Sequence, residues 1–315
     1  MQLSRRPLLP AALLSAVLGS SAVDWPGGLA AQTFRSAVDL VPISAVVRDG
    51  RGRLVTSLKS ADFEVVDKGE PRPILDFQVD RASPVAVALL MDVSGSMRVH
   101  PRQALAEQTA ERILAGLGDG RDEAGLFTFD LSLREVRAFT TDTATIGPSV
   151  RGGQPFGSTS LYDAIAATAR LVAERPWPRR AVIVLTDGLD TSSGLTAPEV
   201  SGLASSIDVP VYVVVTVPEL DRIQYEGRSG VASTQGADLR DLAQWTGGDL
   251  LWTTAETGAE VSAQQLLAEL RQQYLIAIES APGREWRPIE VRVKNRRLSV
   301  RARSGYFGRT PAPER

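Results

Sequence analysis

The middle of the chain alternates between short apolar runs and longer amphipathic stretches. Each apolar run has the length of one strand that is buried on both faces of a parallel sheet. Between the runs, apolar residues recur at the spacing of an amphipathic helix. The predicted strands are 85–91, 124–129, 181–185, 211–215 and 250–252, and the predicted helices are 101–117, 160–174, 197–206, 237–245 and 257–272. This alternation predicts an α/β fold with a doubly wound, mostly parallel sheet, to which 133–139 adds an antiparallel edge strand.

Both flanks of this region have the two-residue alternation of β-strands instead. Strands are predicted before it, within 33–80, and after it, within 274–308. Each set is too small to form a stable domain by itself. We therefore predict that the two segments pair into one small β-sandwich-like domain, into which an α/β domain, residues 84–273, is inserted.

The last two predicted strands are 289–293 and 298–302. Asn295, Arg296 and Arg297 lie between them and favour a turn. Basic residues alternate with apolar ones along both strands, so we expect a half-buried hairpin whose basic face is solvated.

The N-terminus has the pattern of an export signal. Arg5 and Arg6 precede a short apolar run, 11–18, and small residues follow up to Ala31. Residues 1–31 are therefore predicted to be a signal peptide of the Sec or twin-arginine type. No later segment is apolar enough to span a bilayer. We expect an exported protein, periplasmic or secreted, with no stable membrane anchor.

The composition is that of an ordinary folded protein. Of 315 residues, 43% are hydrophobic and 23% are charged, and the formal net charge is −2. A nucleic-acid-binding domain would normally be clearly basic, so we expect no nucleic-acid partner. The chain has no cysteine, which excludes disulfides and zinc–thiolate chemistry.

Candidate chemistry begins where the strand 85–91 ends. Asp92, Ser94 and Ser96 form the pattern D-x-S-x-S, and Thr159 and Asp187 occur where later elements of the same sheet begin or end. The carboxyl ends of parallel strands meet at one edge, where α/β sheets bind ligands. Carboxylate and hydroxyl oxygens suit Mg²⁺, Mn²⁺ or Ca²⁺. We therefore predict a divalent-metal site at this edge.

The D-x-S-x-S pattern at Asp92, followed along the chain by Thr159 and then Asp187, resembles the metal-ion-dependent adhesion site of the von Willebrand factor A family. The resemblance covers about 84–273. It implies that Ser94, Ser96 and Thr159 coordinate the ion, and that Asp92 and Asp187 act directly or through water. The flanks, including the ending Arg303-Ser304-Gly305-Tyr306-Phe307, resemble the exported bacterial "VWFA-related" proteins first described in acidobacteria.

The resemblance implies a non-enzymatic binding module. An open position on the ion would accept an Asp or Glu carboxylate from a protein partner. Tyr162 and the loops 97–101, 130–132, 152–158 and 188–196 are expected to rim the site. For the loop 217–236 two interpretations stay open: it also reaches the site or, as we favour, it is a mobile insertion. The sequence favours no particular oligomeric state.

Two other functions stay open. A metal-dependent hydrolase or phosphatase would use the same carboxylates, but phosphatases of the haloacid-dehalogenase type need a second carboxylate where this chain has Ser94. A serine hydrolase would need a base, and His100 is the only histidine. The third possibility is a structural assembly protein whose metal site is unused.

Overall fold

The computed structural model describes residues 39–79, 83–118, 120–227 and 231–308. The predicted signal peptide, 1–31, lies outside these ranges. Within them, no helix has the length and the apolar character needed to cross a membrane.

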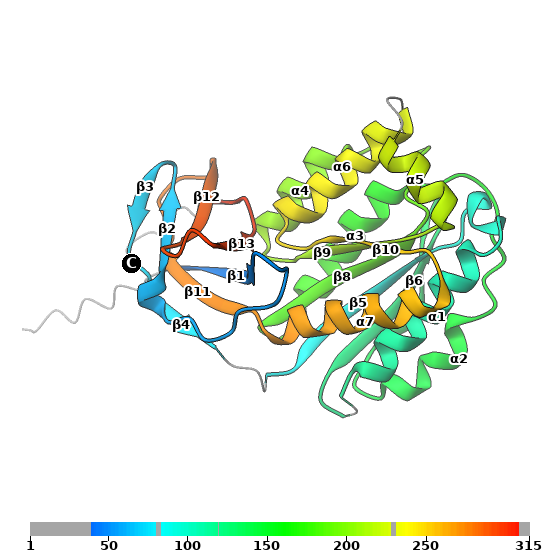
Figure 1. Ribbon diagram of the computed structural model, residues 1–315, viewed down its shortest axis with the longest axis horizontal. Helices are drawn as coiled ribbons and strands as arrows, with labels where there is room; N and C mark the ends of the chain where they lie inside the picture. The colour runs from blue at the N-terminus through cyan, green and yellow to red at the C-terminus, as the bar shows by residue number, and fades with distance from the viewer. Residues whose placement is uncertain (1–38, 80–82, 119, 228–230, 309–315) are drawn as a thin grey trace, which may run out of the picture. The chain divides into compact units, whose positions relative to one another are not determined.

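A six-stranded sheet forms the centre of the α/β part. Its strands are β5 Val85–Asp92, β6 Glu123–Phe129, β7 Leu133–Thr140, β8 Arg179–Thr186, β9 Val211–Thr216 and β10 Leu250–Thr253. They follow the order β10-β9-β8-β5-β6-β7, and all pairings are parallel except that of the edge strand β7 (Figure 1). The predicted α/β fold class is therefore confirmed, including the antiparallel edge.

Helices cover both faces of this sheet (Figure 1). They are α1 Arg102–Gly116, α2 Gly147–Val150, α3 Leu161–Ala173, α4 Ala197–Ser206, α5 Glu219–Gly227, α6 Val231–Trp245 and α7 Glu256–Arg271. Successive residues of β5 point to opposite faces of the sheet. Ala88 and Leu90 pack in the core with α3, α4 and α6, whereas Val87 and Leu89 pack in the core with α1 and α7. All eight residues of β5 are buried.

The segment predicted as a mobile insertion, 217–236, is largely helical. It contains α5 and the start of α6. Glu219 and Asp221 in the first turn of α5 favour a helix start, because the amino end of a helix carries partial positive charge. A loop is therefore wrong for most of the described part of this segment, while the mobility expected of it stays a prediction.

The strands before and after the α/β part share two antiparallel sheets. They are β1 Leu40–Asp49, β2 Phe63–Asp67, β3 Glu70–Arg72, β4 Asp76–Gln78, β11 Tyr274–Glu279, β12 Trp286–Val293, β13 Leu298–Ala302 and β14 Gly305–Phe307. One sheet has the order β13-β1-β11-β4 and the other β14-β12-β2-β3. Ile43, Val65 and Tyr274 are fully buried in the core between them. This is the β-sandwich-like part of the predicted fold class.

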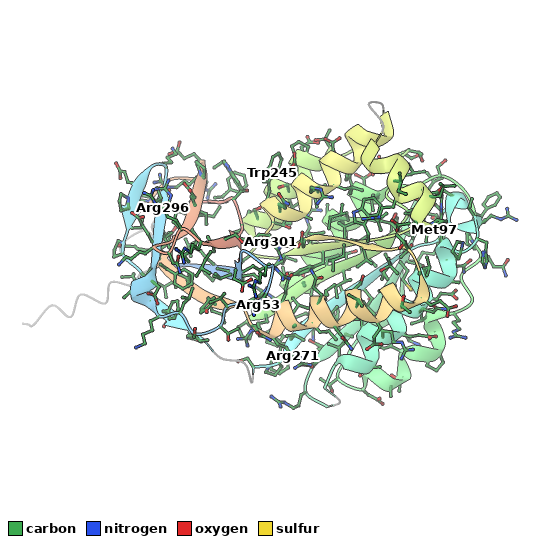
Figure 2. The ribbon with its side chains drawn as sticks, in the orientation of Figure 1. Arg53, Met97, Trp245, Arg271, Arg296 and Arg301 are labelled. Carbon is green, nitrogen blue, oxygen red and sulfur yellow. The ribbon has the colours of Figure 1, made fainter. Side chains whose placement is uncertain are left out.

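The predicted hairpin of the last two strands does not form. β12 pairs with β2 and β14, whereas β13 pairs with β1 in the other sheet, so the turn at 294–297 crosses between the sheets. Two arginines of this region are also not solvated. Arg303 is 3% exposed, and Arg301 lies where the sandwich meets the α/β part, whereas Arg296 is exposed on the sandwich (Figure 2). Alternation along a strand cannot reveal that the second face meets another part of the same chain.

Buried ion pairs attach the sandwich to the α/β part. Glu269 on α7 is almost fully buried and accepts hydrogen bonds from Arg48 of β1 and Arg301 of β13. Arg301 also pairs with Asp249 at 2.7 Å. Arg303 donates to the Ser205 carbonyl at 2.6 Å. Arginine suits such positions because its planar group bonds several acceptors at once.

Glu269→Gln is expected to lower the free energy of unfolding by about 2 kcal/mol, measured by urea denaturation. Breaking a fully buried ion pair costs ~3–5 kcal/mol. The effect is smaller here because the Arg48 and Arg301 side chains remain 20% and 18% exposed. The control is Glu260→Gln on the same helix, where an exposed pair with Arg112 is worth about 0.5 kcal/mol or less. Equal effects of the two changes would contradict this interpretation.

Candidate functional site

The loop that follows β5 gathers three of the predicted ligands. Asp92 ends the strand and is 2% exposed. The Ser94 amide donates to Asp92 Oδ1 at 2.8 Å, which curls the loop back on the strand. The Ser94 and Ser96 hydroxyl oxygens lie 3.1 Å apart, the second of them on the short 3-10 helix Gly95–Arg98. A carboxylate and two hydroxyls thus lie together at the carboxyl edge of the sheet.

A neighbouring strand holds the second oxygen of Asp92. The Thr186 hydroxyl at the end of β8 donates to Asp92 Oδ2 at 2.6 Å and accepts from the Gly188 amide at 3.0 Å. Burial raises the pKa of the Asp92 carboxyl to about 6, and the charge of Asp187 adds to this, while bonds from Ser94 and Thr186 oppose it. Thr186 had no predicted role, although it directly precedes the predicted ligand Asp187 in the sequence.

Main-chain bonds bring the Thr159 loop to the same place. The Gly95 amide donates to the Gly157 carbonyl, and the Phe156 amide donates to the Val93 carbonyl, both at 2.9 Å. Gly95 is needed for this approach, because a Cβ there would lie 3.1 Å from the Gly157 oxygen. Gly157 has φ +83°, a conformation that glycine adopts without strain.

The third loop, after β8, is bonded to the second. Thr159 is 2% exposed, and its carbonyl accepts from the amides of Thr191 and Ser192 at 3.0 and 2.9 Å. The Thr191 hydroxyl in turn accepts from the Thr159 amide at 2.9 Å. Asp187, at the start of this loop, is fully buried. The structure therefore brings all five predicted residues to three adjoining loops, while their role as ligands stays a prediction.

Arg102, at the start of α1, was missed by the sequence analysis. Its guanidinium donates to Asp187 Oδ2 at 2.7 Å and to Asp221 Oδ2 on α5 at 2.8 Å. It also donates to the Ser96 carbonyl at 3.2 Å. No motif signals the two ion pairs, because Asp187 and Asp221 lie 85 and 119 positions from Arg102. A further correction concerns Tyr162, which is 8% exposed in the core instead of lying on the rim.

The donor set fits a hard divalent cation. The oxygens come from two carboxylates and three hydroxyls, and Ser94 Oγ and Ser96 Oγ lie 3.1 Å apart. No group of three or more His, Asp or Glu residues suited to a metal occurs among the described residues. An ion here would therefore depend on the hydroxyls, as Mg²⁺, Mn²⁺ and Ca²⁺ can.

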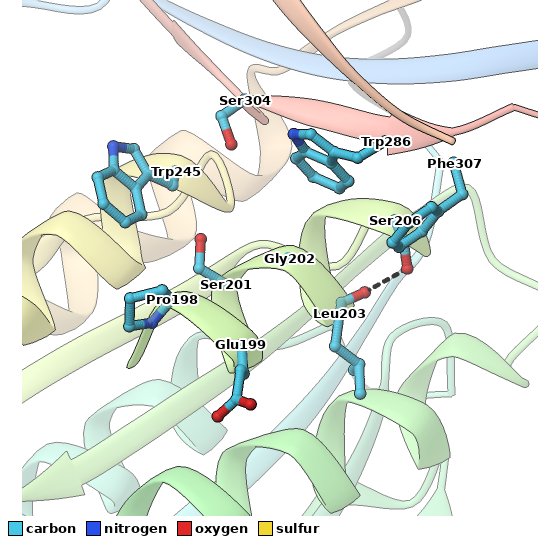
Figure 3. A pocket seen from close by; sticks show the side chains of 10 residues that line it. All are labelled: Pro198, Glu199, Ser201, Gly202, Leu203, Ser206, Trp245, Trp286, Ser304 and Phe307. Atoms are coloured by element: carbon cyan, nitrogen blue, oxygen red, sulfur yellow. Dashed lines mark hydrogen bonds between the residues drawn. The ribbon is translucent and has the colours of Figure 1, made fainter. Parts of the chain in front are cut away.

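A second concave region has a different character. It is a cavity of about 590 Å³ between α4, the end of α6 and strands β12 and β14 (Figure 3). Trp245, Trp286 and Phe307 line it, and Glu199 is its one carboxylate among the lining residues. The three aromatic side chains suit apolar contact.

Comparisons with known proteins address this region of the chain. Residues 87–189, which include all five predicted ligands, match the sequence profile of the von Willebrand factor type A domain. The search of curated proteins gives no match.

Solved structures show weak similarity. An aerotolerance-related membrane protein from Bacteroides fragilis is 20% identical, covering 59% of this chain and 99% of its own, with a TM-score of 0.48. BatB from Bacteroides thetaiotaomicron is 19% identical over 59% and 98%, with a TM-score of 0.47. Proximal thread matrix protein 1 from the mussel byssus, with a zinc-occupied metal-ion-dependent adhesion site, is 17% identical over 64% and 48%, with a TM-score of 0.48.

Thr186→Val is expected to lower the free energy of unfolding by about 1–3 kcal/mol, since it leaves a buried Asp92 oxygen without its donor. Thermal or urea unfolding of the metal-free protein measures this. The control is Thr216→Val at the end of β9, where the hydroxyl makes a longer bond of 3.3 Å to the Thr186 carbonyl. The role given to Thr186 is wrong if the control loses as much stability.

Proposed function

We propose, from the match of residues 87–189 to the von Willebrand factor type A domain, that the chain is an exported, non-enzymatic module that binds a protein partner through a divalent metal ion. The observation that carries the proposal is the convergence of Asp92, Ser94 and Ser96 with the loops of Thr159 and Asp187. In this proposal the module acts in the periplasm or outside the cell, in an architecture like that of the acidobacterial-type exported proteins.

Five side chains would hold the ion. We assign Ser94, Ser96 and Thr159 as hydroxyl ligands and Asp92 and Asp187 as carboxylates acting directly or through water. The ion is Mg²⁺ in this proposal, with Mn²⁺ or Ca²⁺ as alternatives. When bound, it supplies an exchangeable position that a partner's Asp or Glu can take. The residues themselves order the site, because Thr186 and main-chain amides already fix Asp92 and the loops.

Apolar side chains near this edge support a protein partner. Val99, Leu131, Phe156 and Leu220 are 51%, 61%, 75% and 68% exposed. The first three lie on loops that adjoin the site, and Leu220 neighbours Asp221, the partner of Arg102. Exposed apolar residues gathered around a polar centre are typical of protein interfaces. A nucleic-acid partner finds no support, since the chain is slightly acidic.

The arrangement favours binding over catalysis. A serine nucleophile needs a base within hydrogen-bond reach. In the described ranges no histidine bonds Ser94 or Ser96, and His100 is exposed. A phosphatase is the alternative, and it predicts metal-dependent hydrolysis of p-nitrophenyl phosphate, which a binding module lacks.

The full chain is expected to bind one Mn²⁺, measured by calorimetry or electron paramagnetic resonance. Asp92→Asn should weaken this binding by at least about 100-fold, the upper end of what outer-shell changes cost at metal sites. The control is Asp142→Asn, an exposed carboxylate beyond β7, which should bind like the wild type. Unchanged affinity in Asp92→Asn would refute the metal site.

Partner capture is expected to depend on the same ion. Full-length protein should retain a binding partner from an extract of exported proteins in Mg²⁺ and lose it in EDTA, and Asp92→Asn should retain none in either condition. Mass spectrometry of the retained proteins gives the readout. Capture that ignores both the chelator and the substitution would favour the structural assembly protein instead.

A further inference from the structure

One cation is already built into the candidate site. The Arg102 side chain is 14% exposed and its guanidinium lies between two carboxylates, Asp187 at 2.7 Å and Asp221 at 2.8 Å. Asp187 is fully buried, whereas the Asp221 side chain is 30% exposed. Arg102 therefore joins the loop after β8 to helix α5 through a pair of charge-assisted bonds, which are stronger than neutral ones.

We infer that Arg102 is a resident counter-ion that a divalent metal must compete with for Asp187, so that metal loading is coupled to the position of α5. The inference rests on the proposed metal site and adds a regulatory residue to it. Arg102 is a positioning residue here, since it reaches the ion only through Asp187.

Charge explains the competition. A guanidinium keeps its charge across the physiological pH range, so Arg102 neutralises part of the site at all times. Asp187 Oδ2 accepts from Arg102, and Oδ1 accepts from the Leu189 amide at 3.2 Å. A divalent ion bound to Asp187 would share this carboxylate with Arg102. The ion and the guanidinium would then repel each other strongly, because both are positively charged and the site is buried.

Asp221, the second partner of Arg102, connects this competition to helix α5. When an ion weakens the hold of Asp187 on Arg102, the guanidinium still has Asp221, so the balance of its two bonds shifts towards α5. α5 also carries exposed Leu220 and Ile223 beside the site. If metal binding shifts α5, a partner that favours the shifted position of α5 tightens metal binding, and the metal tightens partner binding by the same factor. A partner that packs on α5 would thus promote metal loading.

Mn²⁺ affinity of the full chain tests the inference. Arg102→Gln should tighten Mn²⁺ binding at least about tenfold, which corresponds to ~1.4 kcal/mol. Asp221→Asn should bind no tighter than the wild type, because Arg102 then gives all its charge to Asp187. The control is Arg134→Gln, an exposed arginine that pairs with Asp130 near the same edge, which should change the affinity less than about twofold.

The sign of the Arg102→Gln effect separates this inference from a purely structural role. If Arg102 only props the loop, Arg102→Gln and Asp221→Asn will both weaken Mn²⁺ binding, and the inference fails. If the wild type binds Mn²⁺ and Arg102→Gln is no tighter, the metal site stands and the inference is overturned. If none of the proteins binds Mn²⁺, both proposals fall.

Hydrogen exchange supplies a readout that affinity does not. Mn²⁺ should change amide exchange in 217–223 of the wild type by at least about twofold and leave it unchanged in Arg102→Gln, as reciprocal coupling requires. The same response in both proteins would contradict the coupling.

Discussion

The complete burial of β5 is the constraint on which the rest of the α/β part depends. The strand is covered on both faces and hydrogen-bonded on both edges, to β6 and β8. A polar side chain inside it would lose its water without finding partners, which is costly. Polar chemistry can therefore begin only at the last residue, Asp92, where Thr186 provides a donor. The position of the candidate site follows from the apolar run before it.

From that point the site is held mainly by the backbone. Bonds from the Gly95 amide to the Gly157 carbonyl and from the Thr191 amide to the Thr159 carbonyl connect the three loops. Amide donors and carbonyl acceptors inside the loops would be costly if left unpaired, so their mutual bonding stabilises one arrangement. Rigid presentation of oxygens favours the binding of a metal ion, because little ordering is left to lose on binding.

The features that could be predicted from the sequence are those that depend on one strand and the loop that follows it. The apolar run of β5 and the residues Asp92, Ser94 and Ser96 that follow it were predictable, since strand periodicity and loop composition are local. Contacts between remote elements were not. Arg102 and Asp221 are 119 positions apart, and Arg303 is buried by carbonyls of α4 rather than by its own strand. Alternation predicts that one face of a strand is polar; it does not predict what that face meets.

The sandwich is joined to the α/β part at the edge of the sheet opposite the candidate site. The sandwich is anchored near the amino ends of the parallel strands: Arg301 bonds Asp249 just before β10, and Arg303 bonds the Ser205 carbonyl shortly before β9. Glu269 lies near the end of α7, and that helix leads directly into β11 of the sandwich. Because parallel strands all point the same way, the opposite edge stays clear of the sandwich, and Met97 marks that edge in Figure 2. The same arginines that join the two parts thus hold the sandwich away from the loops that carry Asp92 and Asp187.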